Sequence, residues 1–178
     1  MLVVSFNPLN LNFILAQIFL LGSVFVHSVL RANEQYTLSS QRLSKIIEAE
    51  NKFFDLSKGA IKPSDQELTR KAQEIVASYE SYLGENPQET HALILFGKFL
   101  DKVGQQDHAV NYFLEADTLN PRLAVVKQQI GNYLIEEGRP ADAFPFFMLT
   151  LEIEPHQPAY HFHLANYLFL FKDEVAQA

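Results

Sequence analysis

Three histidines that lie close together, His156, His161 and His163, are the residues whose type could hold a metal ion. Imidazole is a common metal ligand, and a helix presents two ligands on one face when they are three or four residues apart. His161 and His163 are two residues apart, so on a helix their side chains point roughly 200° from one another. No carboxylate partner completes a ligand set beside them. We therefore expect ordinary packing or surface histidines and no metal site.

The rest of the composition also argues against an enzyme. The 178-residue chain has no cysteine, which removes disulfides, cysteine-based zinc sites and thiol nucleophiles. It carries no Ser-His-Asp signature, glycine-rich phosphate loop or paired-carboxylate motif. Its formal charge is −7 without clustered Lys or Arg, so nucleic acid is not an expected partner. We expect neither a cofactor nor catalysis.

The N-terminal segment differs from the remainder. Residues 1–32 contain no Asp or Glu, and Arg31 is their only side-chain cation. The apolar stretch from Phe13 to Val26 has the length of a signal-peptide core and is shorter than the ~20 residues of a membrane-spanning helix. We expect residues 1–32 to be a signal peptide, cleaved after Ser28 or Ala32, and the protein to be exported to a periplasmic or extracellular location. An uncleaved anchor across residues 9–30 and a buried core helix are the alternatives, because the α-amine of Met1 is the only positive charge before the apolar stretch.

A period of 34 residues runs through the second half of the chain. The prolines at 87, 121 and 155 are separated by this interval each time. The same interval relates four further pairs of residues: Gly97 and Gly131, Gly104 and Gly138, Ala109 and Ala143, Phe113 and Phe147. Periods between about 20 and 50 residues indicate stacked structural repeats.

Each repeated position has a physical role in a pair of helices. We expect a first helix over 90–103, ended by Gly104 in the left-handed conformation, and a second helix over 107–119. Gly97 and Ala109 should let the two backbones approach closely, while Phe113 fills the space between neighbouring units. Pro121 should end the second helix, because proline disfavours helical geometry in the residue before it.

These residues resemble the tetratricopeptide repeat (TPR) family. The resemblance implies an all-α, right-handed helical solenoid of antiparallel helix pairs, preceded here by the N-terminal hydrophobic segment. It covers roughly residues 64–178, with clear repeats at 90–123 and 124–157 and partial repeats at 64–89 and 158–178. Positions that define the repeat are Gly97, Gly104, Ala109, Phe113, Ala116, Pro121, Gly131, Gly138, Ala143, Phe147 and Pro155. The tryptophan that is frequent early in the first helix is replaced by Leu93 and Lys127, and Thr150 stands where the first unit has Ala116.

The segments that flank the clear repeats are less regular. Residues 36–63 should form an N-terminal capping helix of about 36–57 and a linker, and Ser64 should cap a helix over 65–83. In the second unit Pro145 falls inside the second helix, so we expect Asp142 to be the N-cap, or else a kinked helix from Pro140. At the C-terminal end, residues 161–171 form an apolar first helix without a complete second one, which we interpret as the mark of a fragment of a longer protein.

In TPR arrays one stripe of each first helix faces an inner groove. Here the stripe would comprise His91, Ile94, Lys98, Asp101, Val125, Gln128, Asn132, Ile135, Ala159, Phe162, Asn166 and Phe169. We expect a non-enzymatic interaction module that binds an apolar or amphipathic peptide or protein segment in this groove. The carboxylate clamp of some TPR domains has only Lys98 and Asn132 as counterparts, so it is not expected. The alternatives are a substrate-positioning region of an enzyme whose catalytic part lies beyond residue 178, and a structural subunit of a cell-envelope assembly.

Overall fold

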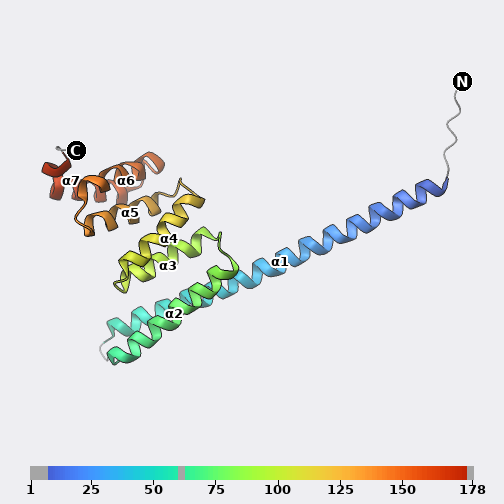
Figure 1. Ribbon diagram of the computed structural model, residues 1–178, viewed down its shortest axis with the longest axis horizontal. Coiled ribbons are helices and arrows are strands. Elements are labelled where there is room, and N and C mark those ends of the chain that lie inside the picture. The colour runs from blue at the N-terminus through green and yellow to red at the C-terminus, as the bar shows by residue number, and fades with distance from the viewer. Residues whose placement is uncertain (1–7, 60–62, 176–178) are drawn as a thin grey trace, which may run out of the picture. The chain divides into compact units, whose positions relative to one another are not determined.

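The computed structural model is helical throughout the part of the chain that it describes, namely the backbone of residues 8–59 and 63–175 and the side chains of 28, 31, 33–59 and 63–171. Figure 1 shows the helices in order, and no strand occurs among these residues. Their bounds are α1 Pro8–Lys58, α2 Asp65–Glu85, α3 Thr90–Lys102, α4 Gln106–Leu119, α5 Ala124–Glu136, α6 Pro140–Ile153 and α7 Pro158–Val175. The all-α fold predicted from the sequence is confirmed.

The chain divides into two compact units, Met1–Lys45 and Ile46–Ala178. In the first unit the helix begins at Pro8, well before the start near residue 36 that the sequence suggested. Proline is tolerated in the first turn of a helix, and no further proline occurs before Pro63 to end it. The predicted signal peptide lies largely outside the described residues, since 1–7 and the side chains of 8–27 are not described, and it stays a prediction.

None of the helices, over the residues that could be searched, is long and apolar enough to cross a membrane.

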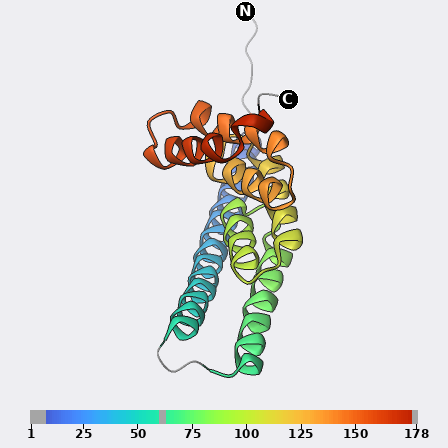
Figure 2. The same cartoon turned by 90° about the vertical axis from the view of Figure 1, so that its left-hand side faces the viewer.

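The second unit is an array of helix pairs, with α3 and α4 forming one pair and α5 and α6 the next (Figure 2). Gly104 and Gly138 turn each pair with φ of 82° and 69°, the left-handed conformation that the sequence predicted for them. The residue after each glycine donates a backbone hydrogen bond across the turn. The Gln105 amide donates to the Leu100 carbonyl and the Arg139 amide to the Leu134 carbonyl, both at 2.8 Å. The pairs α3–α4 and α5–α6 thus have the same turn at residues 34 positions apart.

Aromatic rings and ion pairs connect successive helix pairs. Phe147 lies 5.1 Å, centroid to centroid, from Tyr167 of α7, and Tyr79 of α2 is stacked at 5.0 Å on Phe96 of α3. Between α4 and α5 the Lys127 ammonium lies 2.6 Å from a carboxylate oxygen of Asp117. In the second repeat, residues 124–157, the position that is frequently tryptophan is therefore occupied by the buried Lys127, with Asp117 as its counter-ion.

The C-terminal end of α1, which falls within the predicted capping helix, contacts α2 through a buried hydrogen bond. Glu50, near the C-terminal end of α1, accepts a hydrogen bond of 2.8 Å from the Tyr79 hydroxyl, and both side chains are buried. Ser64 is the N-cap of α2, as predicted, and its hydroxyl accepts from the Glu67 amide at 3.2 Å. Glu67 itself forms an ion pair with Lys71, so the reciprocal half of the capping box is not made.

The start of α6 corrects one prediction. The N-cap is Arg139 and Pro140 occupies the first turn, so Asp142 is not the cap. Asp142 instead lies in the first turn, where a carboxylate is stabilised by the helix dipole, and it also pairs with Arg139 at 2.6 Å. Pro145 lies inside the helix on its exposed side. It has no N–H and therefore cannot donate to the Ala141 carbonyl.

Candidate partner-binding surfaces

The predicted inner stripe is most buried on α3. Ile94 is only 9% exposed and belongs to the core, so it offers little surface to a partner. Lys98 and Asp101 are partly buried, and His91 at the start of the helix is exposed. Burial lowers the pKa of Lys98, and repulsion from Lys102 lowers it further.

On α5 the stripe is intermediate in burial. Val125, Gln128, Asn132 and Ile135 are all partly buried, and none is fully enclosed. Two apolar and two amide side chains therefore share this helix face without a formal charge. The surface is suited to contacts that combine apolar burial with a few hydrogen bonds.

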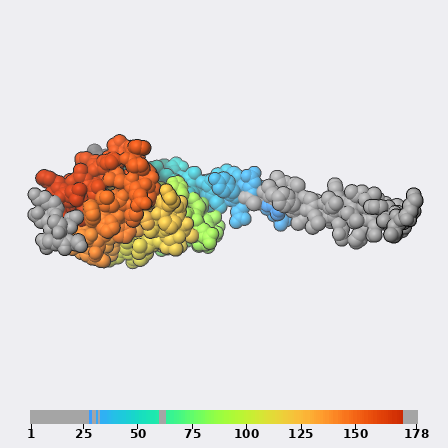
Figure 3. Space-filling view, turned by 90° about the horizontal axis from the view of Figure 1, so that it is seen from above, coloured from blue at the N-terminus to red at the C-terminus, as the bar shows by residue number. Residues whose placement is uncertain are grey.

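On α7 the stripe is open to solvent. Phe162 is 70% exposed and Phe169 is 81% exposed, and Asn166 lies exposed between them in sequence. Phe162 and Phe169 are seven residues apart, so they share one side of the helix. Residues 158–171 contain no Asp, Glu, Lys or Arg. Figure 3 shows the atoms of α5, α6 and α7, orange to red, forming a continuous surface.

His156, His161 and His163 do not come together as metal ligands. The Nε2 of His161 lies 2.7 Å from the Pro155 carbonyl oxygen, a contact at the start of α7. His163 lies beside Phe162, with ring centroids 6.0 Å apart, and His156 is exposed. Within the described part of the chain, no three His, Asp or Glu side chains are grouped so that they could hold a metal ion.

A hollow that no residue of the predicted inner stripe lines was not predicted from the sequence. It has a volume of about 300 Å³ and is lined by residues of α2, α3 and α4, among them Val76, Glu80, Phe96, Leu100, His108 and Tyr112. We call it the Tyr112 hollow. The sequence does contain one indication of it, because the position of Glu80 does not follow the repeat: 34 residues later the chain has Leu114.

Two further hollows adjoin it at Gln105. One, of about 330 Å³, runs along α2 from Thr69 to Glu80, and the other, of about 500 Å³, is lined by Asp107, Glu136 and Glu137. The pKa of Glu136 is raised by burial and by the neighbouring charges of Asp101 and Glu137. Among the described residues that line the three hollows there is no Lys or Arg.

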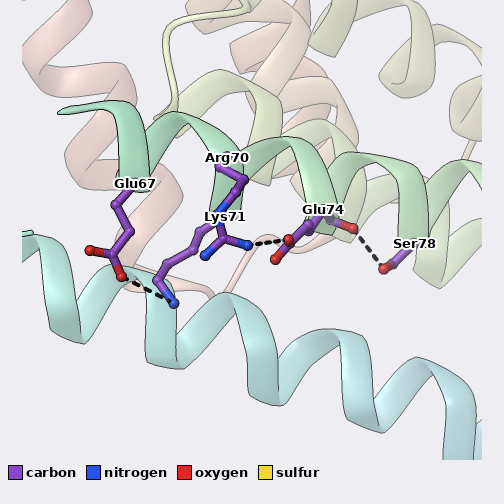
Figure 4. A network of polar contacts seen from close by, with 5 residues as sticks. All are labelled: Glu67, Arg70, Lys71, Glu74 and Ser78. Atoms are coloured by element: carbon purple, nitrogen blue, oxygen red, sulfur yellow. Dashed lines mark hydrogen bonds and ion pairs between the residues drawn. The ribbon is translucent and has the colours of Figure 1, made fainter. Parts of the chain in front are cut away.

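Another face of α2 carries paired charges. Figure 4 shows Lys71 with Glu67 and Arg70 with Glu74, and the Ser78 hydroxyl donating to the Glu74 carbonyl. The Lys71 pair measures 3.7 Å, and its partners are partly exposed. Exposed pairs of this spacing contribute about 0.3–0.5 kcal/mol each. Lys71, Glu74 and Ser78 also line a hollow of about 350 Å³, together with Phe53 and Leu56 of α1.

Scans of family models and of curated proteins found no match. Solved structures are similar in fold. Those of pilF from Pseudomonas aeruginosa and of the thermophilic TPR protein TTC0263 from Thermus thermophilus match with TM-scores of 0.53 and 0.54 at 23% and 15% identity. Each match covers 60% of this chain, and it covers 49% and 54% of the other chains, so this chain spans about half their length.

A third structure is matched over nearly all of its length. The first TPR of Spaghetti (RPAP3), solved with the HSP90 peptide SRMEEVD, has a TM-score of 0.57 at 16% identity, over 75% of this chain and 95% of that one. Together with the repeated turns and aromatic contacts, these similarities show that the compact unit Ile46–Ala178 has a TPR-like fold.

Proposed function

We propose that the TPR-like array is a non-enzymatic interaction module that binds a protein or peptide segment. The observation that carries this proposal is the exposure of Phe162 and Phe169 on α7, 70% and 81%, on the helix face predicted to line the inner groove. Exposed aromatic side chains on one face are typical of interaction sites, where burial of each ring is favourable. Similarity to the peptide-bound RPAP3 domain supports the same class of function.

The occupant we propose is apolar or amphipathic, such as one face of a helix or an extended hydrophobic segment. The partly buried stripe on α5 is uncharged, and on α3 the charge of Lys98 is offset by that of Asp101. An acidic tail would find few cations here. Nucleic acid would be repelled by the formal charge of −7.

A pull-down from an envelope extract tests this site. The full chain is compared with a double variant, Phe162→Asp and Phe169→Asp, and with a control, Leu114→Asp, which alters a 48% exposed leucine on α4. We expect the double variant to lose the partner and the control to keep it, with unchanged helical circular dichroism in both. Because the contact is apolar, retention should differ little between about 0.1 M and 1 M salt.

Recovery of the same partners by all three proteins would exclude the inner face as the binding site. The array would then be better described as a structural subunit of an envelope assembly, the third reading of the sequence.

We also propose that the protein is exported, on the basis of the apolar N-terminal segment. N-terminal sequencing should then find a mature chain that begins near Val29 or Asn33. Intact Met1 in a membrane fraction would instead support the anchor across residues 9–30.

A second candidate function is that of a region within a longer enzyme. A Thermobaculum terrenum O-GlcNAc transferase matches with a TM-score of 0.52 at 18% identity, over 71% of this chain and 22% of that one. A TPR-like array can therefore form a minor part of an enzyme chain. Sequencing of the gene beyond the codon for Ala178 distinguishes the two, because further 34-residue units favour the binding module and catalytic motifs favour the enzyme.

A further inference from the structure

The Tyr112 hollow lies between the second helices of two successive units. Val76 and Glu80 come from α2, Tyr112 comes from α4, and Phe96 and Leu100 of α3 contribute its apolar residues. Its volume of about 300 Å³ corresponds to roughly ten water molecules at liquid density, so a long side chain can enter. None of the residues of the predicted inner stripe lines it.

Aromatic packing holds the wall of the hollow in place. The Tyr112 ring lies 4.5 Å, centroid to centroid, from Phe96, and Phe96 is in turn stacked at 5.0 Å on Tyr79. Tyr79 and Phe96 are almost completely buried. A wall supported in this way by the core is a preformed binding surface, which lowers the entropic cost of binding.

The polar side chains that line the hollow belong to Glu80, Gln105, His108, Asn111 and Tyr112. Glu80 and the Tyr112 hydroxyl form no hydrogen bond or ion pair with any described residue. Burial raises the pKa of Tyr112, and the negative charges of Glu80 and Glu115 raise it further, so the hydroxyl remains protonated. The lining residues include the carboxylate of Glu80 and no Lys or Arg.

We propose that the Tyr112 hollow binds the side chain of an arginine carried by a protein partner. A guanidinium group combines a planar face that stacks on an aromatic ring with donors that match a carboxylate. Its face would lie on Tyr112, its N–H groups would donate to Glu80, and its aliphatic stem would cover Val76 and Leu100. Lysine offers a point charge without the planar face and fits this combination less well.

A protein segment is favoured over a free small molecule because the hollow continues on both sides. The groove along α2 and the hollow at Asp107, Glu136 and Glu137 both meet it at Gln105. A chain that places an arginine on Tyr112 can therefore extend along the array. Basic residues beside that arginine would reach the carboxylates of the second hollow and relieve their mutual repulsion.

The second repeat, residues 124–157, provides an internal comparison. Displacement by 34 residues replaces Glu80 by Leu114, Gln105 by Arg139 and His108 by Asp142. There the chain supplies its own guanidinium, since Arg139 Nη2 lies 2.6 Å from Asp142. In the first repeat no Lys or Arg lines the Tyr112 hollow, so we assign the guanidinium to the partner.

Nuclear magnetic resonance titration of the full chain tests this site. The probe is a short Gly-Ser peptide with one central arginine, and matched peptides carry citrulline, which has the same shape without charge, or lysine. We expect the arginine peptide to shift the Val76 and Leu100 methyl signals and the Tyr112 ring signals to saturation. The citrulline peptide should bind about tenfold more weakly, since charged hydrogen bonds are roughly twice as strong as neutral ones.

Two exposed variants make the assignment specific. Glu80→Gln should weaken the arginine peptide about five- to tenfold, whereas Glu74→Gln, which alters a carboxylate elsewhere on α2 (Figure 4), should change it less than about twofold. The double variant at Phe162 and Phe169 should bind the arginine peptide as the wild type does, so this result is independent of the inner-face site.

Equal binding of the citrulline peptide, an unaffected Glu80→Gln variant, or an absence of saturable shifts at these signals would overturn the proposal. Equal affinity for argininamide alone would overturn the assignment to a protein segment.

Discussion

The ring of Phe113 in α4 lies directly over Gly97 in α3. A Cβ atom at position 97 would be 2.6 Å from Cε1 and 2.9 Å from Cζ of that ring. The corresponding pair of the second unit, Gly131 and Phe147, would give contacts of 3.0 and 3.2 Å. In each unit the glycine therefore leaves room for the aromatic ring of the partner helix.

Gly97→Ala should destabilise the protein. Alanine favours a helix over glycine by about 1 kcal/mol, but the methyl group would force the buried Phe113 ring to shift, and overpacking of a core costs about 1–3 kcal/mol. We expect a net loss of up to about 2 kcal/mol in the free energy of unfolding, measured by urea denaturation. Gly131→Ala should lose less, because its contacts are longer.

Gly84→Ala is the matched control, since a Cβ there would meet no atom within 4 Å. It should be neutral or stabilising by up to about 1 kcal/mol. Equal effects at Gly84 and Gly97 would show that the ring contact does not determine the cost.

The Lys127–Asp117 pair should respond asymmetrically to mutation. The side chains are only 10% and 23% exposed, so Asp117→Ala leaves a nearly buried ammonium without its counter-ion. We expect a loss of about 2–3 kcal/mol in the free energy of unfolding for this variant. Lys127→Met replaces the charge by an apolar chain of similar length and should stay within about 1 kcal/mol of the wild type.

Thermal or urea unfolding of both variants measures the difference. A larger loss for Lys127→Met than for Asp117→Ala would contradict a role for the desolvated lysine charge.

The sequence predicted the elements whose residues recur every 34 positions, because a repeated glycine, alanine, aromatic and proline each imply a local geometry. Gly104 and Gly138 have the predicted left-handed conformation. The role of Gly97 was predicted only in part. The period shows that a small residue is needed, but only the structure shows that the Phe113 ring, and not the backbone of α4, takes the space.

Features that break the repeat could not be predicted in the same way. Ile94 has the spacing of an inner-face residue yet is buried, since periodicity defines a helix face and not what covers it. The Tyr112 hollow depends on Glu80 and Tyr112, which lie on two different helices and share no local sequence pattern. Of the two predicted starts of α6, Asp142 as the cap or a helix from Pro140, the structure has the second, because proline is favoured at the first helical position.

Stability should fall at alkaline pH through Tyr79. Burial raises the pKa of its phenol well above the usual 10, and the charge of Glu50, to which it donates, raises it further. The unfolded chain loses this proton above about pH 10 while the folded chain retains it, so the contribution to stability present below pH 10 is lost as pH rises. In Tyr79→Phe the decline above pH 10 should be shallower by up to about 1.4 kcal/mol per pH unit.

Urea unfolding at several values from neutral to alkaline pH measures this slope. Tyr36→Phe is the control, because Tyr36 is 73% exposed and should leave the slope unchanged. Identical slopes for wild type and Tyr79→Phe would show that the buried phenol does not couple to unfolding.

Tyr167 should determine whether α7 stays attached to α6. Its ring lies among Phe144, Phe147 and Phe171, and its hydroxyl donates to the Pro140 carbonyl. Tyr167→Phe removes only the hydrogen bond and should cost about 1 kcal/mol, whereas Tyr167→Ala removes a buried aromatic ring and should cost about 3–5 kcal/mol.

Amide hydrogen exchange shows which helices are destabilised by the Tyr167 substitutions. In Tyr167→Ala the amides of α7 should exchange much faster while those of α3 and α4 keep their protection, because helices of a repeat array contact mainly their neighbours and can open locally. Tyr167→Phe should show a smaller increase confined to α7. If the substitution accelerated exchange equally in all helices, α7 would belong to the same cooperative unit as the central repeats. If α7 in Tyr167→Ala kept its wild-type protection, contacts other than those of Tyr167 would hold it to α6.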